Sequence, residues 1–329
     1  MPVIFSHPAS LEHDTGYGHP ERPDRIRAIE QRLDRRDWLG WERREAPAAE
    51  LEQLLAVHPG EHVERVRELS ASGGAFDLDT PLSAGSYEAA LRAAGGACSL
   101  VETLMSGGER VGFSALRPPG HHCERARAMG FCLFATVSIA ARHALDSLGA
   151  SRVLVLDWDV HHGNGTNAIF HASSDVLFAS IHQYPFYPGT GPLEDVGSGD
   201  GTGYSLNLPV PAGAGEDVFC ALVEHVVLPA ARQFEPDLLL LSAGYDAHRD
   251  DPVGGCSLET GSFAELTRQV LTLGVPVGAV LEGGYDLDAL ADGVETTMET
   301  LAAGGEPGSH PAEPVTERAR AVLRSHWEL

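Results

Sequence analysis

Short, continuous apolar runs separated by segments of helical length recur along this chain and limit the folds open to it. The five runs are Val111–Ala115, Val153–Asp157, Val176–Ile181, Leu238–Ala243 and Val277–Leu281. Runs of this kind are typical of strands buried on both faces of a parallel sheet. The helix-length segments are Ser86–Met105, Phe131–Leu148, Glu216–Phe234, Ser262–Leu273 and Leu287–Leu301. Their alternation predicts an α/β fold with a parallel sheet.

The chain has 329 residues and no internal repeat, and we expect one α/β domain over residues 1–301. Ala302–Pro314 is the one linker-like stretch, and residues 315–329 are expected to form a helix that packs on the same domain. No uncharged apolar run approaches the ~18 residues of a membrane helix, and the first residues lack a basic leader. We therefore predict a cytoplasmic protein without membrane contacts.

The balance of charge excludes one class of partner. Against 23 Lys and Arg there are 47 Asp and Glu, which gives a formal net charge of −24. A protein this acidic repels phosphate backbones, so we predict no direct contact with nucleic acid. The five cysteines include no Cys-x-x-Cys pair, which argues against both a disulfide framework and a thiolate zinc site. The oligomeric state is left open.

Polar clusters follow four of the predicted strands, at the point where each strand ends. They are His121-His122, the group Asp157, Asp159 and His161, then Asp246, and finally Gly283-Gly284-Tyr285. In open α/β sheets, ligands bind outside the carboxyl ends of the strands. Four independent clusters at such ends predict one shared pocket.

The group after Val153–Asp157 suits a metal ion. Asp157, Asp159 and His161 alternate along an extended segment, so their side chains share one face. Carboxylates with an imidazole suit Zn²⁺ or Fe²⁺, and Asp246 is the natural third ligand of a site with an open position. Helix capping by the same residues is the alternative. It accounts poorly for three such side chains within five positions.

Two other clusters suit proton transfer and oxyanion binding. A rigid Pro-Pro-Gly turn holds His121 and His122 side by side, which suggests general acid–base work. Gly283-Gly284-Tyr285 would bring backbone close to a site and present one phenol to a developing oxyanion. Taken alone, each has a plainer interpretation as hydrogen-bonded turn histidines or a buried tyrosine.

Longer motifs occur in one fixed order along the chain. They are Gly18–Arg25, Arg117–His122, Gly130–Cys132, Asp157–Thr166, Tyr187–Gly191, Ser242–Gly255 and Glu282–Tyr285. In these motifs the chain resembles the zinc-dependent histone deacetylase family over about its first 290 residues. That family includes class II deacetylases, acetylpolyamine amidohydrolases and acetoin-utilisation proteins. The resemblance implies the arginase-deacetylase fold, a single open α/β/α domain with a mostly parallel, typically eight-stranded sheet.

The resemblance also implies roles for individual residues. The catalytic Zn²⁺ or Fe²⁺ would be held by Asp159, His161 and Asp246. His122 becomes the general base and acid, His121 its electrostatic partner, and Tyr285 the oxyanion donor. Asp157 would orient His121. A structural K⁺ or Na⁺ is implied at Asp157, Asp159, His161, Ser180 and Ile181.

Channel and rim positions are implied in the same way. Gly130, Phe131 and Tyr187 match the channel that holds an acyl-lysine stem, with Gly283 and Gly284 beside it. Asp79 matches a rim carboxylate that binds substrate amides, and Arg25 matches an interior arginine. Val253 occupies a rim position where a glutamate reads an acetylpolyamine and a leucine accompanies protein substrates. The expected substrate is therefore an acyl-lysine peptide or a small N-acyl amine, hydrolysed by metal-activated water. Acetylpolyamine hydrolysis is the alternative.

Two departures and two competing hypotheses qualify this assignment. Asn164 replaces the aspartate of class I deacetylases, and a neutral amide orients His122 without stabilising its cation as strongly. Tyr187 places a hydroxyl where phenylalanine is common. A two-metal manganese site of the arginase type would need carboxylates in place of Gly163 and His248. A catalytically inactive acyl-lysine-binding protein should have lost a ligand, the base or the tyrosine, and this chain retains all of them.

Overall fold

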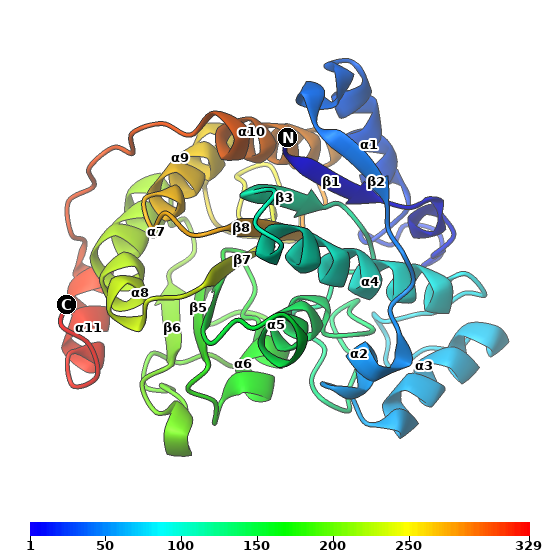
Figure 1. The fold of residues 1–329 in the computed structure, drawn as a ribbon, viewed down its shortest axis with the longest axis horizontal. Coiled ribbons are helices and arrows are strands. Elements are labelled where there is room, and N and C mark those ends of the chain that lie inside the picture. Colours follow the sequence, from blue (N-terminus) through cyan, green and yellow to red (C-terminus); the bar gives the residue numbers. More distant parts are fainter.

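A single eight-stranded sheet runs through the computed structural model, which describes residues 1–329 (Figure 1). Its spatial order is β2-β1-β3-β8-β7-β4-β5-β6, and every adjacent pair is parallel. The strands are β1 (Val3–Ser6), β2 (Glu42–Glu45), β3 (Val111–Ser114), β4 (Val153–Asp157), β5 (Val176–Gln183), β6 (Ser205–Val210), β7 (Leu238–Ala243) and β8 (Val277–Leu281). The predicted fold class is confirmed, and the sheet is entirely parallel.

Helices cover both faces of the sheet. The helices are α1 (Asp24–Asp34), α2 (Leu51–Leu55), α3 (Gly60–Ser72), α4 (Ser86–Met105), α5 (Thr136–Ser147), α6 (Asn164–Phe170), α7 (Glu216–Leu222), α8 (Leu228–Phe234), α9 (Thr260–Leu271), α10 (Leu287–Ala303) and α11 (Pro314–Leu323). Helices α4 and α5 pack on one face, and α1 with α7 to α10 pack on the other (Figure 1). The sheet is the middle layer of three.

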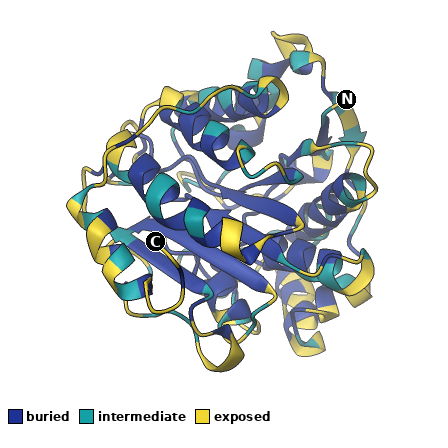
Figure 2. Ribbon diagram, turned by 60° about the vertical axis from the view of Figure 1, so that its left-hand side comes forward, coloured by how far each residue is buried: buried dark blue, intermediate teal, exposed yellow.

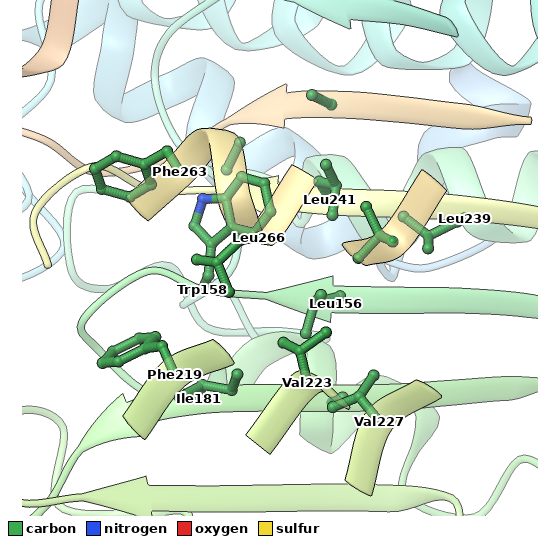
Figure 3. Packing of buried hydrophobic residues seen from close by; sticks show 14 of the residues in the cluster. Leu156, Trp158, Ile181, Phe219, Val223, Val227, Leu239, Leu241, Phe263 and Leu266 are labelled. Atoms are coloured by element: carbon green, nitrogen blue, oxygen red, sulfur yellow. The ribbon is translucent and has the colours of Figure 1, made fainter. Parts of the chain in front are cut away.

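Alternation along the buried strands explains why two cores form. In β4, Leu154 and Leu156 join the core beneath α7 and α9, whereas Val153 and Val155 join the core beneath α4 and α5. Figure 2 shows the central strands buried along their length. Figure 3 shows side chains of α7 and α9 packed on the first of these cores, around Trp158. Strands with apolar side chains on both faces of the sheet need a layer of helices on each side to bury them.

Several predicted boundaries were wrong. The helix expected from Phe131 begins at Thr136, because Gly130 and Phe131 have φ of 56° and 69°, which no right-handed helix accommodates. By contrast, the helix expected over Glu216–Phe234 has the predicted ends, because α7, a π-helical turn at Val223–Val227 and α8 follow one another without a break.

Three strands were not predicted at all. Strands β2 and β6 form the two edges of the sheet, and β2 consists entirely of charged residues (Glu42–Glu45). An edge strand needs no continuous apolar run, and its charges discourage pairing with another chain. Strand β1 (Val3–Ser6) is buried but only four residues long.

The C-terminal segment lies against the same layers. Helix α11 begins at Pro314, and Ala319, Leu323 and Trp327 contribute to the core beneath α7 and α9. The preceding stretch is tied down through backbone N–H groups, since Gly308 donates to Glu265 and His310 donates to Glu224. None of the helices has the length and apolar character that crossing a membrane requires.

Candidate metal centre and active-site pocket

The strand register brings the predicted metal ligands together. Strands β4 and β7 are neighbours with Asp157 opposite Ser242, so the turns that follow them meet at the carboxyl edge of the sheet. The turn after β4 is fixed by its own carboxylates, since the Asp159 N–H donates to Asp157 at 3.1 Å and the His161 N–H donates to Asp159 at 2.9 Å. Asp246 spans the two turns by accepting the Val160 N–H at 2.9 Å.

Asp159, His161 and Asp246 form a compact, buried donor set. One ligand atom from each lies within 4.8 Å of the others, and His161 Nδ1 is 3.1 Å from Asp159 Oδ1 and 3.2 Å from Asp246 Oδ2. Glycines make room for the carboxylates, because a Cβ on Gly283 would lie 2.1 Å from Asp246 Oδ2.

The electrostatics of this set fit a divalent cation. Burial, together with the nearby Asp159, raises the pKa of Asp246 to about 7. Burial opposes charge on His161, yet the two carboxylates raise the pKa of its imidazole to about 10. Two buried carboxylates therefore share one imidazole as their counter-charge, and a bound M²⁺ would stabilise both anions. The residues fit Zn²⁺ or Fe²⁺ by donor type.

His121 and His122 lie beside this set with different partners. His121 Nδ1 bonds Asp157 Oδ2 at 2.9 Å, and His122 Nδ1 bonds Asn164 Oδ1 at 2.8 Å. Burial alone would lower the pKa of His121, but Asp159 and Asp157 raise it well above its ordinary value. Burial and the neighbouring His121 lower the pKa of His122 well below its ordinary value. His122 is thus the neutral member, and its Nδ1–H donates to Asn164 and leaves Nε2 free as a base.

Tyr285 faces the same pocket. Apart from its backbone N–H, it makes no hydrogen bond within the protein, so its hydroxyl is free to donate into the pocket that it lines. Burial and Asp246 raise the pKa of this phenol well above its ordinary value, so it is a neutral donor. Arg25 supports the loop by donating from Nε to the Gly284 carbonyl at 2.6 Å, and its guanidinium carbon is 5.1 Å from the Tyr285 ring centroid.

These groups open into a pocket of about 240 Å³. Its lining residues are Asp79, His122, Gly130, Phe131, His161, Phe186, Tyr187, Val253 and Tyr285. Gly130 passes so close to His122 that a Cβ there would lie 2.5 Å from His122 Cδ2. The predicted channel and rim residues are therefore assembled in one cavity. Gly283 and Gly284 lie behind it as backbone, and are not among the lining residues.

The residues predicted to bind a monovalent cation lie on β4, on the turn that follows it and on β5. Asp157 and Ser180 are register partners in β4 and β5, with Ile181 next in the strand. The Ser180 hydroxyl bonds His182 Nδ1 at 3.0 Å. The K⁺ or Na⁺ site stays a prediction.

Other metal arrangements fit the geometry poorly. A Cβ on Gly163 would lie 2.3 Å from Asp157 Oδ2, so a second-metal carboxylate has no room there. A further buried group, His58, His62 and Cys123, has donor atoms within 4.8 Å of one another. Both nitrogens of His58 are already used, since Nδ1 bonds the Arg125 carbonyl and Nε2 accepts the Ala135 N–H, each at 2.9 Å. That group anchors backbone.

Sequence reasoning assigned no role to two residues of the site. Phe186 stacks on His161 with ring centroids 5.3 Å apart. Glu282, fully buried, accepts the N–H groups of Gly120 at 2.6 Å and His121 at 3.1 Å through Oε2. Burial raises the pKa of Glu282 to about 7, against the effect of His121. The sequence offered only one indication for each residue: Phe186 directly precedes Tyr187, and Glu282 directly precedes Gly283.

Comparison with known proteins gives a consistent result. A model of the histone deacetylase domain matches residues 19–301. The chain is 41% identical over 276 residues to the histone deacetylase-like amidohydrolase of Pseudomonas aeruginosa, an alignment that covers 82% of this chain and 73% of that protein. It is 36% identical over 294 residues to a probable deacetylase of Archaeoglobus fulgidus, which covers 87% and 81%.

A solved structure extends the match to three dimensions. The crystal structure of the HDA15 HD domain aligns with a TM-score of 0.94 at 35% sequence identity, and covers 99% of this chain and 96% of that one. The resemblance inferred from the motifs is confirmed. With the family model matching most of the chain, and with relatives well above 30% identity, this protein belongs to the histone deacetylase family.

Proposed function

We propose that this chain is a metal-dependent deacetylase that hydrolyses the amide of an N-acyl-lysine peptide or a related small N-acyl amine. Relatives named as deacetylases and as an amidohydrolase support deacetylase activity in general. The metal dependence and the substrate class are our inference from the site. Zn²⁺ is the metal proposed for Asp159, His161 and Asp246, with Fe²⁺ as the other candidate.

One observation carries the proposal. Two polar groups without protein partners, His122 Nε2 and the Tyr285 hydroxyl, line the same pocket as His161 of the donor set. A base and a neutral donor that converge beside a cation-binding group are the parts that amide hydrolysis needs. No nucleophilic serine or cysteine lines the pocket.

His122 and His121 have different roles in proton transfer because their environments differ. The metal, when bound, would polarise the amide carbonyl and lower the pKa of water. His122 takes a proton from the attacking water at Nε2 and returns it to the departing amine, while Asn164 holds its Nδ1. His121 remains charged beside Asp157 and keeps His122 neutral until the proton arrives.

The oxyanion and the substrate stem are held by other groups. The Tyr285 hydroxyl donates a hydrogen bond to the carbonyl oxygen as it gains charge, a contribution typically worth about 3–4 kcal/mol. Phe131, Tyr187 and Phe186 provide aromatic surface for the aliphatic part of a lysine side chain. Asp79, at the rim, is placed to accept amide N–H groups of a peptide backbone. We also retain K⁺ or Na⁺ near Asp157 as a proposed structural ion.

Metal removal tests the proposal most directly. Purified protein should contain about one Zn²⁺ or Fe²⁺ per chain by elemental analysis and should hydrolyse an acetyl-lysine peptide. A chelator should lower kcat by about a hundredfold or more, and one equivalent of metal should restore it. Asp246→Ala should lose both metal and activity. Asp250→Ala, a charge-matched control at an exposed neighbour, should keep both.

Three outcomes would count against the proposal or its substrate assignment. Full activity in metal-free protein would exclude the metal's role. Metal-loaded protein that fails to turn over any acyl-lysine peptide, acetylpolyamine or small N-acyl amine would support the inactive binding protein instead. Turnover confined to acetylpolyamines would move the substrate assignment to the alternative.

A further inference from the structure

Asp251 lies behind the pocket and none of the steps above uses it. The residue is only 7% exposed. Oδ2 accepts the backbone N–H of Tyr285 at 2.6 Å and that of Asp286 at 3.1 Å, while Oδ1 accepts the N–H of Val253 at 2.9 Å. One carboxylate thus connects the loop that carries the rim residue Val253 to the loop that carries Tyr285.

Backbone amides provide the stabilisation of this anion. Asp251 has no ion-pair partner within 4 Å, in contrast to the buried carboxylate Glu21, which pairs with Arg25 and Arg117. A buried carboxylate without a cation persists only where several N–H donors converge on it. Each such charge-assisted bond is short and directional, so the donors are held in place as firmly as the acceptor.

Hydrogen bonds therefore hold the Tyr285 loop from two sides. Asp251 holds the amides of Tyr285 and Asp286, and Arg25 holds the carbonyls of Glu282 and Gly284 at 2.5 and 2.6 Å. Between them Gly284 has φ of 119°, a conformation that L side chains rarely adopt. A loop with such a residue at its centre needs external contacts to keep one geometry.

Simple anchoring of helix α10 does not account for these bonds. The N-cap of α10 is Asp286, whose own side chain accepts the Ala289 N–H at 2.9 Å. The bond from Tyr285 to Asp251 lies before the helix, at the residue whose hydroxyl faces the pocket.

We propose that Asp251 is a positioning residue for the hydrolysis inferred above. It sets the place of the Tyr285 hydroxyl through the Tyr285 backbone and fixes the Val253 rim to the same point. This inference rests on the proposed function, because it assigns Asp251 an effect on an oxyanion donor. The expected consequence is a loss in kcat that passes through Tyr285.

A double-mutant cycle separates this role from a general structural one. Asp251→Asn keeps the shape but removes the charge that strengthens all three bonds, and its NH₂ group cannot accept an N–H, so the connection is weakened on both sides. In the wild-type background we expect kcat for an acetyl-lysine peptide to fall about tenfold or more, with KM changed less than about threefold. In the Tyr285→Phe background the same substitution should lower kcat by less than about threefold, because the hydroxyl it positions is gone.

The matched control is Asp250→Asn, the same change at an exposed neighbour, which should leave kcat and KM within about twofold of wild type. Hydrogen exchange provides a second readout that needs no activity. Asp251→Asn should speed exchange in a peptide that spans Glu282–Leu290 and leave the β4 and β7 peptides unchanged. If Asp251→Asn does not fold, Asp251→Glu, which retains the charge on a longer stem, takes its place in the cycle with the same expectations.

Equal losses of kcat in both backgrounds would overturn the positioning role, as would unchanged kcat in folded Asp251→Asn. Wild-type protein that hydrolyses no acyl amide would instead refute the proposed function. In that case the exchange measurement still decides the connection: faster exchange confined to the Tyr285 loop supports it, and unchanged exchange refutes it.

Discussion

The floor and the rim of the pocket are built in different ways. On the floor, Asp157, Asp159 and Asp246 are fully buried, and each carboxylate has a defined hydrogen-bond or ionic partner. At the rim, Tyr187 is 37% exposed, and Leu78, next to the pocket residue Asp79, is fully exposed. A buried charge that loses its partner is costly, whereas an exposed side chain is replaced at little cost. The floor should therefore tolerate almost no change, and the rim is where substrate preference can vary.

The largest effects should come from the two free groups that the floor presents. His122→Ala and Tyr285→Phe should each lower kcat by about a hundredfold or more, because one removes the proposed proton acceptor and the other the proposed oxyanion donor. Both variants should retain the metal, since neither residue belongs to the donor set. Steady-state kinetics with elemental analysis checks both points. Tyr285→Phe that turns over at the wild-type rate would remove the oxyanion role and weaken the contrast between floor and rim.

A smaller loss is expected one layer further from the substrate. Asp157 bonds His121 and is not in the proposed donor set, so Asp157→Asn should lower kcat by about tenfold and leave most of the proposed metal in place. Its dependence on K⁺ or Na⁺ should weaken if the predicted ion is bound nearby. Activity titrated against KCl and NaCl, with metal content measured in parallel, tests this. Direct coordination of the catalytic metal by Asp157 in a crystal structure would refute the assignment.

The same contrast explains what could be predicted from the sequence. The central strands β4, β7 and β8 are apolar on both faces, so each appears in the sequence as a continuous apolar run. The polar residues that follow these runs predict the floor of the pocket. The edge strands β2 and β6 have no such requirement, and the start of α5 depends on two residues with positive φ. These features depend on position in the sheet and on backbone conformation, which a hydrophobic pattern does not encode.

Residues that bond to the backbone of the site could not be predicted from the sequence either. Glu282 bonds the Gly120 N–H across 162 positions of sequence, and Asp251 bonds the Tyr285 N–H across 34. Almost every residue type has a backbone N–H group, so the amino acid at the donor position does not indicate that such a bond forms. The pairing of the Asn164 and His122 side chains could be predicted, because the family resemblance assigns a specific side chain to each position.

The smallest effect, and the one that most sharpens the comparison, is expected at the rim. Val253 lines the pocket mouth and is apolar, so it cannot pair with the ammonium of a polyamine. We therefore expect wild-type protein to prefer acyl-lysine peptides or neutral N-acyl substrates to acetylspermidine. Val253→Glu should shift the ratio of kcat/KM toward acetylspermidine by roughly three- to tenfold. That is less than a fully desolvated ion pair would give, because solvent reaches the rim.

Val253→Gln is the matched control for this change, since it has nearly the same shape and no charge. It should leave the ratio close to that of wild type, and added salt should reduce the effect of Val253→Glu. Both variants should keep kcat for the acetyl-lysine peptide within about threefold, because the floor is untouched. A tenfold wild-type preference for acetylspermidine would place selectivity elsewhere on the rim. Asp251 binds Val253 only through the backbone N–H, which Val253→Gln keeps, so a large loss of kcat in this variant would contradict the independence of rim and floor.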